Sequence, residues 1–310
     1  MLEDTIPTMG TVARVVRDSD GACDVRALLE EFDRRLSRFN SASDLSRLNC
    51  DPRPAVPAGS LLRAAVSAAL RAASLTGGLV DPTLLSAVRG AGYGESRATI
   101  APPPLPQALA AAPTRRPARP HPAARWRAVR VDDTAGLISR PPGLELDLAG
   151  SVKGWAADIL GAQLGRHGRF AVDMGGDLRL AARRGAPWEV RVLHPLTGET
   201  AHTLQLRAGG VATSGIDTRL WQRDSGEFAH HLIDPSTGSP AWTGLITATA
   251  LAPSALEAEA LAKAALLSGP AAARRLLRSR HGGVLVHDDG AVEPIGRRPR
   301  RQLPFSRRVR

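Results

Sequence analysis

Apolar residues recur at intervals of three and four along several stretches of this chain, a spacing typical of amphipathic helices. The pattern is clearest over 25–39, and the stretch 59–74, rich in leucine and alanine, ends before a pair of glycines. The same reasoning predicts helices over 152–166, 255–268 and 271–279. A Gly-Pro pair separates the last two helices, because proline cannot continue a helix from the preceding turn.

Other stretches alternate apolar and polar residues, or are short apolar runs bounded by turn residues, and these favour β-strands. The predicted strands are 144–148, 170–174, 188–193, 203–206, 244–251 and 283–287. Turns that contain glycine join several of them, which indicates antiparallel pairing rather than repeated strand–helix–strand units. The pattern therefore predicts the α+β class, with mixed, largely antiparallel sheets and flanking helices.

The length of 310 residues, with 43% hydrophobic and 23% charged residues, suits a folded protein with a sizeable core. Eight prolines between 101 and 124 indicate a short helix flanked by irregular linker. We expect one domain over 1–296, with this variable segment on its surface. A basic tail over 297–310 follows, and we expect it to be disordered.

The formal net charge of +11 is concentrated in two short segments. Segment 115–130 holds six arginines and segment 297–310 holds seven, with no acidic residue in either, so the rest of the chain has a net charge of about −2. Such segments can contact RNA or anionic lipid, but more often they are merely solvated. We therefore expect no nucleic-acid partner.

Cysteine content and the N-terminal sequence bear on the compartment. Cys23 and Cys50 are too few for a disulfide framework and lack the spacing of a zinc site. The chain starts with acidic residues where a signal peptide has cations, and it has no run of about 18 apolar residues. These features predict a cytoplasmic protein with no membrane span.

Only two of the 41 basic residues are lysines, Lys153 and Lys263. A chain that uses arginine almost everywhere has a chemical reason to keep lysine where a compact cation must lie beside a phosphate or carboxylate. Chance retention is the alternative. We interpret both lysines as parts of a ligand site.

Glycine-rich polar segments lie at the ends of predicted elements: 147–154, 173–177, 212–215 and 230–238. Glycine lets backbone amides approach an anion closely, and Lys153 at a helix start adds a cation to the helix dipole. This combination suits a diphosphate. The chain has neither a GxxxxGK[ST] loop nor a GxGxxG fingerprint, so neither a Walker nor a Rossmann site is supported.

The order and spacing of these motifs resemble the ApbE family of flavin transferases over most of the chain. The matching segments are 9–11, 38–49, 78–83, 147–154, Asp158, 175–177, 211–215 and 231–238. The resemblance implies a Mg²⁺-dependent enzyme that splits FAD, transfers FMN to a threonine or serine of an acceptor flavoprotein, and releases AMP. It also implies an ApbE-like, T-fold-like architecture with FAD in a cleft between two lobes.

The resemblance assigns roles to residues by their position in the motifs. Asn49, Asp81 and Thr83 would line the flavin end of the cleft. The other residues expected to contact the cofactor are Met9, Gly175, Gly176, Asp177, Thr213 and Ser214. Lys153, His231 and Asp234 would surround the reacting phosphates and act in catalysis.

General chemistry supports two of these roles. Attack at phosphorus builds charge on the nonbridging oxygens, which Lys153 is placed to neutralise. His231 can accept the proton of an acceptor hydroxyl or donate to a phosphate oxygen, because histidine titrates near neutrality. Its neighbour His230 is expected to point to the opposite face of an extended strand and to have no such role.

The metal site departs from the family pattern. The family places an aspartate and, four residues later, a threonine on the late helix as metal ligands, with a backbone carbonyl near Gly150. Glu259 and Lys263 occupy the two side-chain positions here. Glutamate can reach Mg²⁺, but an ammonium group cannot ligate a metal.

Three interpretations of Glu259 and Lys263 follow. They form an ordinary ion pair on a solvated helix face, or Lys263 takes over phosphate neutralisation from the metal, or the site binds flavin without catalysis. We favour the second. For the whole chain, the alternatives to a transferase are a non-catalytic FAD-binding or flavin carrier protein, an FAD pyrophosphatase of the same fold, and a nucleic-acid-associated protein.

Overall fold

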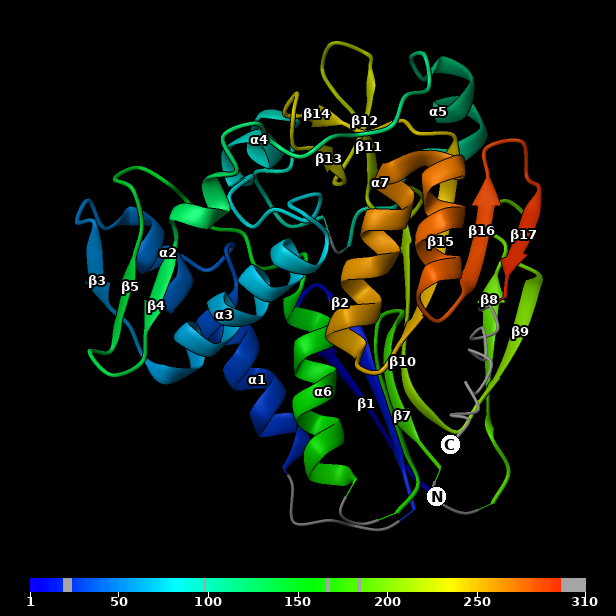
Figure 1. The fold of residues 1–310 in the computed structure, drawn as a ribbon, viewed down its shortest axis with the longest axis horizontal. Helices are drawn as coiled ribbons and strands as arrows, with labels where there is room; N and C mark the ends of the chain where they lie inside the picture. The colour runs from blue at the N-terminus through cyan, green and yellow to red at the C-terminus, as the bar shows by residue number, and fades with distance from the viewer. Residues whose placement is uncertain (19–23, 98, 166–167, 183–184, 297–310) are drawn as a thin grey trace, which may run out of the picture.

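The computed structural model of the chain describes residues 1–310 except 19–23, 98, 166–167, 183–184 and 297–310. The predicted basic tail therefore lies outside the described residues. An eight-stranded antiparallel sheet runs through the structure (Figure 1). Its strands, in spatial order, are β1 (Leu2–Thr8), β2 (Thr11–Arg17), β6 (Phe170–Met174), β7 (Asp177–Ala181), β10 (Ala208–Gly215), β15 (Leu245–Ala252), β16 (Gly283–His287) and β17 (Val292–Ile295).

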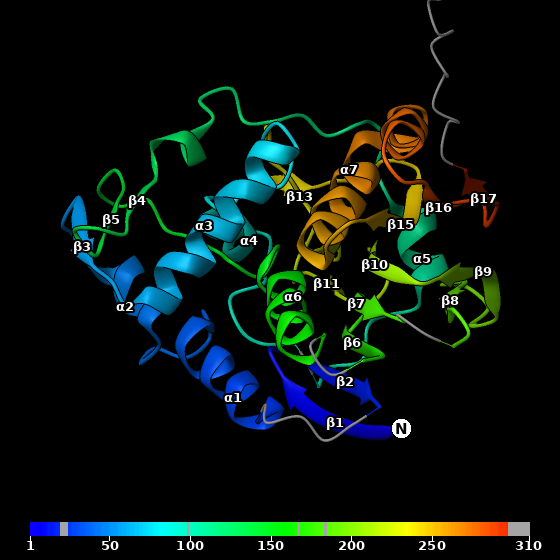
Figure 2. The same cartoon turned by 60° about the horizontal axis from the view of Figure 1, so that its bottom comes forward.

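Two helices cover one face of this sheet. Helix α6 (Val152–Leu164) packs on β6 and β7, helix α7 (Ala255–Ser279) packs on β10 and β15, and the two helices contact each other (Figures 1 and 2). Residues 170, 172 and 174 of β6 are buried and alternate with partly buried ones. This period of two is the one that predicted the strand.

A second layer of helices extends the core away from the sheet. Helices α1 (Val25–Leu36) and α3 (Ser60–Leu75) lie beside α6 (Figure 2). Leu29, Phe32 and Leu62 are buried in the same apolar cluster as Leu160 of α6. The apolar stripes that predicted the helices are thus the surfaces that hold this lobe to the sheet.

The N-terminus of α7 is fixed by side chains from two directions. The carboxylate of Asp158, on α6, accepts hydrogen bonds from the backbone N–H groups of Ala255 and Leu256 at 2.8 and 3.0 Å. Ser254 caps the helix by accepting from the N–H of Glu257. The start of α7 is therefore locked to α6, and so are the residues that α7 presents one turn later.

Helix α7 is kinked where the sequence predicted a break. Gly269 has φ of 72°, a left-handed conformation that favours glycine, and Pro270 follows it. The two predicted helices, 255–268 and 271–279, are the two arms of this kinked element.

Residues 144–148 do not form the predicted strand. Leu146 instead exchanges two hydrogen bonds of 2.8 Å with the side-chain amide of Asn49, and the N–H of Asp147 donates to the carbonyl of Pro82. These partners satisfy the extended backbone without a neighbouring strand. The sequence alternates apolar and acidic residues as a strand would, but the backbone hydrogen bonds of this segment are made to Asn49 and Pro82 and not to a neighbouring strand.

Strands β8 (Trp188–Leu193) and β9 (Thr200–Leu206) pair with each other and not with the large sheet, so the sheets are several. The remaining elements are α2 (Asp44–Cys50), β3 (Ala55–Pro57), α4 (Leu85–Gly90), α5 (Leu105–Ala111), a 3₁₀ turn at Arg125–Ala128, β4 (Arg130–Asp132), β5 (Leu137–Ser139), β11 (Leu220–Gln222), β12 (Phe228–His230), β13 (Ile233–Asp234) and β14 (Ser239–Pro240). In the described part of the chain, no helix is both long and apolar enough to cross a membrane.

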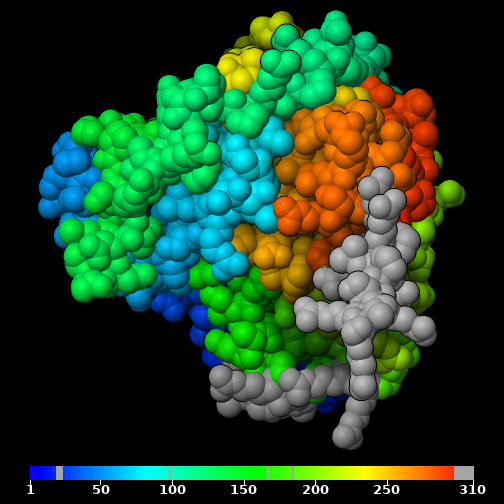
Figure 3. Space-filling model, in the orientation of Figure 1, coloured from blue at the N-terminus to red at the C-terminus, as the bar shows by residue number. Residues whose placement is uncertain are grey.

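The proline-rich segment 101–124 contains α5 and is otherwise irregular. Figure 3 shows this stretch running over the surface of the molecule, above α3 and α7. Its backbone is attached to the body, since the N–H of Arg116 donates to Trp242 and that of Ala118 to Leu267. The linker expected from the prolines is thus a surface strap with fixed contacts.

The crossing of α6 and α7 depends on the absence of a side chain at Gly154. A Cβ there would lie 2.6 Å from the carbonyl oxygen of Ala255 and 2.9 Å from a carboxylate oxygen of Glu259. We expect Gly154→Ala to lower the free energy of unfolding by about 1–3 kcal/mol, measured by guanidinium denaturation. Gly90→Ala is the control, because a Cβ at Gly90 meets nothing within 4 Å. Equal stabilities of the two variants would contradict this packing.

Candidate functional site

A cavity of about 530 Å³ lies between the first turn of α6, the middle of α7 and the loops at one end of the sheet. Its volume is within the range of cofactor sites, roughly 300–1,000 Å³. The sequence-predicted residues that line it are Met9, Asp81, Gly150, Lys153, Gly175, Asp177, Thr213, Ser214, His231 and Lys263. Residues from six separate motifs therefore converge on one space.

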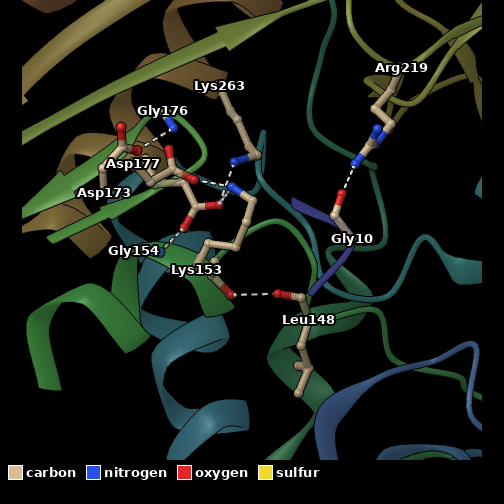
Figure 4. A network of polar contacts seen from close by, with 11 residues as sticks. Gly10, Leu148, Lys153, Gly154, Asp173, Gly176, Asp177, Arg219 and Lys263 are labelled. Atoms are coloured by element: carbon tan, nitrogen blue, oxygen red, sulfur yellow. Dashed lines mark hydrogen bonds and ion pairs between the residues drawn. The ribbon is translucent and has the colours of Figure 1, made fainter. Parts of the chain in front are cut away.

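Lys153, Lys263 and Asp177 line one side of the cavity, and the buried carboxylate of Glu259 joins them in one network of polar contacts (Figure 4). The Lys153 ammonium, on the first turn of α6, bonds to Asp177 Oδ2 and lies 3.4 Å from Glu259 Oε1. Lys263 Nζ lies 2.8 Å from the same Glu259 oxygen. The other Glu259 oxygen accepts the N–H of Gly154 at 2.9 Å. Glu259 thus links both lysines to the start of α6.

Burial and charge act differently on the two carboxylates. Burial opposes ionisation of Glu259, but Lys263 and Lys153 outweigh it and hold its pKa at about 2. Burial, helped by the charge of Glu259, raises the pKa of Asp177 to about 6. Burial also acts against the charge of Lys153, yet Asp177 and Glu259 raise its pKa. Both lysine contacts are therefore made to a firmly ionised Glu259.

The β6–β7 turn supplies backbone groups to the same wall. Gly175 and Gly176 have φ of 71° and 96°, and a Cβ at Gly175 would collide with Thr11. Asp173 Oδ1 accepts the N–H of Gly176 at 2.7 Å, which fixes the turn. On the neighbouring strand, the hydroxyl of Thr213 pairs with that of Thr249 at 2.8 Å. Only glycine fits this turn, and it brings backbone close to the cavity.

His231 lines the cavity, whereas His230 does not. His230 is fully buried, packs edge-on against the Trp242 ring, and accepts the N–H of Leu232 at its Nδ1. The expectation that the two imidazoles diverge is in line with this geometry. Burial, together with His230 and the cations of Lys263 and Arg219, holds the pKa of His231 well below its usual value. The cavity therefore contains a neutral imidazole.

Some predicted site residues lie elsewhere. The side-chain amide of Asn49 is hydrogen-bonded to the backbone of Leu146, and Asn49 does not line the cavity, although Asp147 and Ala149 of the same loop do. The Thr83 hydroxyl donates to Asp81 at 2.7 Å and leaves the other Asp81 oxygen buried without a hydrogen-bond partner in the described structure. Thr83 thus positions Asp81, and Asp81 faces the cavity.

Asp234 is not beside the lysines, contrary to expectation. Its carboxylate accepts the backbone N–H groups of Arg119 and Ser236 and the Ser236 hydroxyl, and it lines a separate cavity of about 310 Å³. An aspartate followed by proline, serine and threonine is suited to such a turn, because its side chain replaces backbone acceptors. These contacts hold the carboxylate in the turn and away from the lining of the main cavity, so the structure does not bring Asp234 together with the other residues predicted to be catalytic.

The residues at the expected metal position do not fit a divalent cation. Glu259 is already paired with an ammonium group and a backbone N–H, and Lys263 brings a positive charge to the place of a ligand. Among the described residues, no group of three histidine, cysteine or acidic side chains is arranged to hold a metal ion. Gly150 lines the cavity, but its carbonyl alone would be a poor site for Mg²⁺.

Sequence reasoning missed two arginines that line the cavity, Arg38 and Arg219. The Arg38 side chain is 4% exposed, lies 3.3 Å from Asp147, and stacks 4.1 Å from the Phe39 ring centre. Arg38 opens the motif 38–49, so its place in that motif was an available signal. Arg219 lies in no motif, and only the fold places it beside His231.

Known proteins are similar to this chain along most of its length. The sequence profile of the ApbE family matches residues 9–286. The chain is 32% identical over 286 residues to an FAD:protein FMN transferase of Klebsiella pneumoniae, covering 87% of this chain and 79% of that protein. An FAD:protein FMN transferase of Treponema pallidum is 33% identical, with the same coverage of both chains.

Solved structures agree in fold. The ApbE protein from Thermotoga maritima superimposes with a TM-score of 0.76 at 26% identity, covering 94% of this chain and 96% of that one. The apo form of the Pseudomonas stutzeri flavinyl transferase ApbE gives 0.73 at 25% identity, with 94% of each chain covered. The α+β architecture predicted from the sequence is therefore confirmed.

The raised pKa of Asp177 leads to a testable pH dependence of stability. The pKa of Asp177 is 3.8 in the unfolded chain and about 6 in the folded protein. Between these two pH values the folded protein binds a proton that the unfolded chain has released. The stabilising contribution of Asp177 is therefore present below about pH 4 and is lost as the pH rises through about 6. We expect Asp177→Asn to remove this slope, which amounts to about 2–3 kcal/mol. Urea denaturation at several pH values measures it, with exposed Asp224→Asn as the control. An unchanged slope in Asp177→Asn would refute the assignment.

Proposed function

Because the chain belongs to the ApbE family, we propose that it is an FAD:protein FMN transferase. It cleaves FAD, joins FMN through a phosphoester to a threonine or serine of an acceptor flavoprotein, and releases AMP. FAD is the substrate. We place the protein in the cytoplasm, which the free thiol of exposed Cys50 supports.

One observation carries this proposal: two ammonium groups, a glycine turn and a neutral imidazole face the same cavity. A diphosphate has negative oxygens that need such cations, and charge on them grows as the acceptor oxygen attacks. Lys153 and Lys263 are held in place by Glu259, so little reorganisation is required. The two lysines therefore stabilise the negative charge of the transition state more than the smaller charge of the bound diphosphate before attack.

The reaction requires one proton transfer. The acceptor hydroxyl oxygen forms a bond to the phosphorus of the FMN half, the bond from that phosphorus to the bridging oxygen breaks, and AMP leaves with that oxygen. His231 accepts the hydroxyl proton, because its lowered pKa keeps the imidazole unprotonated at neutral pH. Asp81 and Arg38 both line the cavity, and Arg38 stacks on the Phe39 ring, so these residues are suited to hold the flavin ring and its polar edge.

The cation requirement is part of the proposal. Mg²⁺ is not included as a bound group, since the donor set of Glu259 and Gly150 does not suit it. We propose instead that Lys263 neutralises the phosphate charge. The interpretation as an ion pair on a solvated helix face fits less well, and the transfer assay separates catalysis from binding alone. Glu259 is fully buried and Lys263 lines the cavity.

The transfer itself is tested by intact mass. Incubation with FAD and an FMN-binding acceptor domain is expected to add the mass of FMN minus water to the acceptor. His231→Ala should slow this gain by about 100-fold or more, because the general base is lost. His281→Ala, at an exposed histidine, is the control. Release of FMN and AMP without labelling would indicate a pyrophosphatase, and FAD binding without cleavage would indicate a carrier.

The role of Lys263 is tested by removing metal. We expect the wild-type protein to keep transferring FMN in excess EDTA, whereas Lys263→Thr loses about 100-fold or more of that activity because a positioned cation is gone. Lys263→Arg keeps the positive charge and is the control: it should retain more activity than Lys263→Thr if the missing cation, and not a disturbed fold, causes the loss. Complete loss of wild-type activity in EDTA, recovered by Mg²⁺, would overturn the metal-free assignment.

A further inference from the structure

A second, smaller groove of about 270 Å³ adjoins the main cavity. Thr218 and Arg219 belong to both, so the groove and the cavity meet at these two residues. The groove is formed by Thr218, Arg219 and β11 on one side, and by Arg97, Ile100, Ala101 and Pro103 on the other. None of the motifs that carry the resemblance includes it.

The groove is positively charged. Arg97 and Arg219 are among its nine lining residues, and none of the nine is acidic. The polar partners recorded for these two guanidinium groups in the described structure are backbone carbonyls, Gly92 for Arg97 at 3.3 Å and Gly10 for Arg219 (Figure 4). A full charge paired only with a carbonyl dipole can gain further from a carboxylate.

The groove also has an apolar floor and rim. The Trp221 ring is buried, its N–H donates to the carbonyl of Ala91, and Arg97 lies 5.2 Å from its centre. Ile100 is 56% exposed at the rim, although it is a large apolar side chain. An exposed aliphatic residue beside two cations suits a short peptide segment, which has both apolar and charged side chains, better than a free nucleotide.

The position of Arg219 connects the groove to the reaction. Its carbonyl accepts the backbone N–H of His231 at 3.3 Å, so the groove ends beside the proposed base. Its side chain reaches across to Gly10 in the β1–β2 turn, which also lines the main cavity. A chain entering along the groove would therefore arrive next to His231 after passing Arg219.

We propose that this groove docks the acceptor protein, as an extended segment that carries a carboxylate close to the modified threonine or serine. The proposal rests on the transferase function above and adds the chemistry of its second substrate. Arg97 binds the carboxylate at the outer end, and Ile100 packs against an apolar side chain of the same segment. Arg219 leaves Gly10 to contact the segment at the inner end.

The test uses synthetic acceptor peptides. Two twelve-residue peptides carry one threonine flanked by either aspartates or asparagines, and FMN transfer from FAD is measured by mass. We expect the aspartate peptide to have a KM about 10-fold lower with the wild-type protein. Arg97→Glu should raise the KM of the aspartate peptide about 10-fold or more and leave the KM for FAD unchanged, because Arg97 does not line the main cavity.

A charge-reversed pair separates recognition from folding. A third peptide, with lysines in place of the aspartates, should be a better substrate for Arg97→Glu than for the wild-type protein. Ile100→Ser is expected to raise the KM of every peptide. Arg71→Glu, at an exposed position on α3, is the charge-matched control and should change nothing.

The outcomes distinguish this proposal from the function on which it rests. If no peptide or acceptor domain is labelled by any variant, the transferase function itself fails. If labelling occurs but Arg97→Glu and the wild-type protein have the same KM for all three peptides, the acceptor docks elsewhere and this proposal is overturned.

Discussion

The buried carboxylate of Glu259 is the interaction on which the candidate site depends. An ionised group without solvent is tolerated only when cations and hydrogen-bond donors surround it. Lys263, Lys153 and the N–H of Gly154 meet that requirement, from α7 and from the first turn of α6. The same contacts hold the two helices together and present two ammonium groups to the cavity. Stability and ligand chemistry therefore share one set of bonds.

Much of the fold followed from periodicity. The helices 25–39, 59–74 and 152–166 appear within a few residues of their predicted bounds, and the kink at Gly269 lies where proline demanded it. Strand β10 was read only as a glycine-rich ligand segment, because residues 208–215 are small and lie under α7 and so show no alternation. The 144–148 segment failed for the opposite reason: it alternates, but the side chain of Asn49 takes the place of a partner strand.

Site residues that belong to short sequence motifs could be predicted from the sequence, whereas residues that reach the site only through the tertiary fold could not. The cavity is lined by Lys153, Gly175 and His231, and each belongs to a motif whose residue types are suited to binding an anion. Asp234 belongs to an equally suggestive motif, yet its carboxylate is consumed by a turn. The same side chain can cap a turn or bind a ligand, and sequence alone does not say which. Arg219 lies in none of these motifs, and its side chain is held at the site by the carbonyl of Gly10 in the β1–β2 turn, a contact that exists only in the folded protein.

The direct measurement of the central claim is a crystal structure of the protein soaked with FAD in the presence of EDTA. The account predicts a diphosphate whose oxygens lie about 3 Å from both Lys153 Nζ and Lys263 Nζ, with His231 beside the FMN phosphorus. A diphosphate bound away from Lys263, or bound only when Mg²⁺ is supplied, would contradict it.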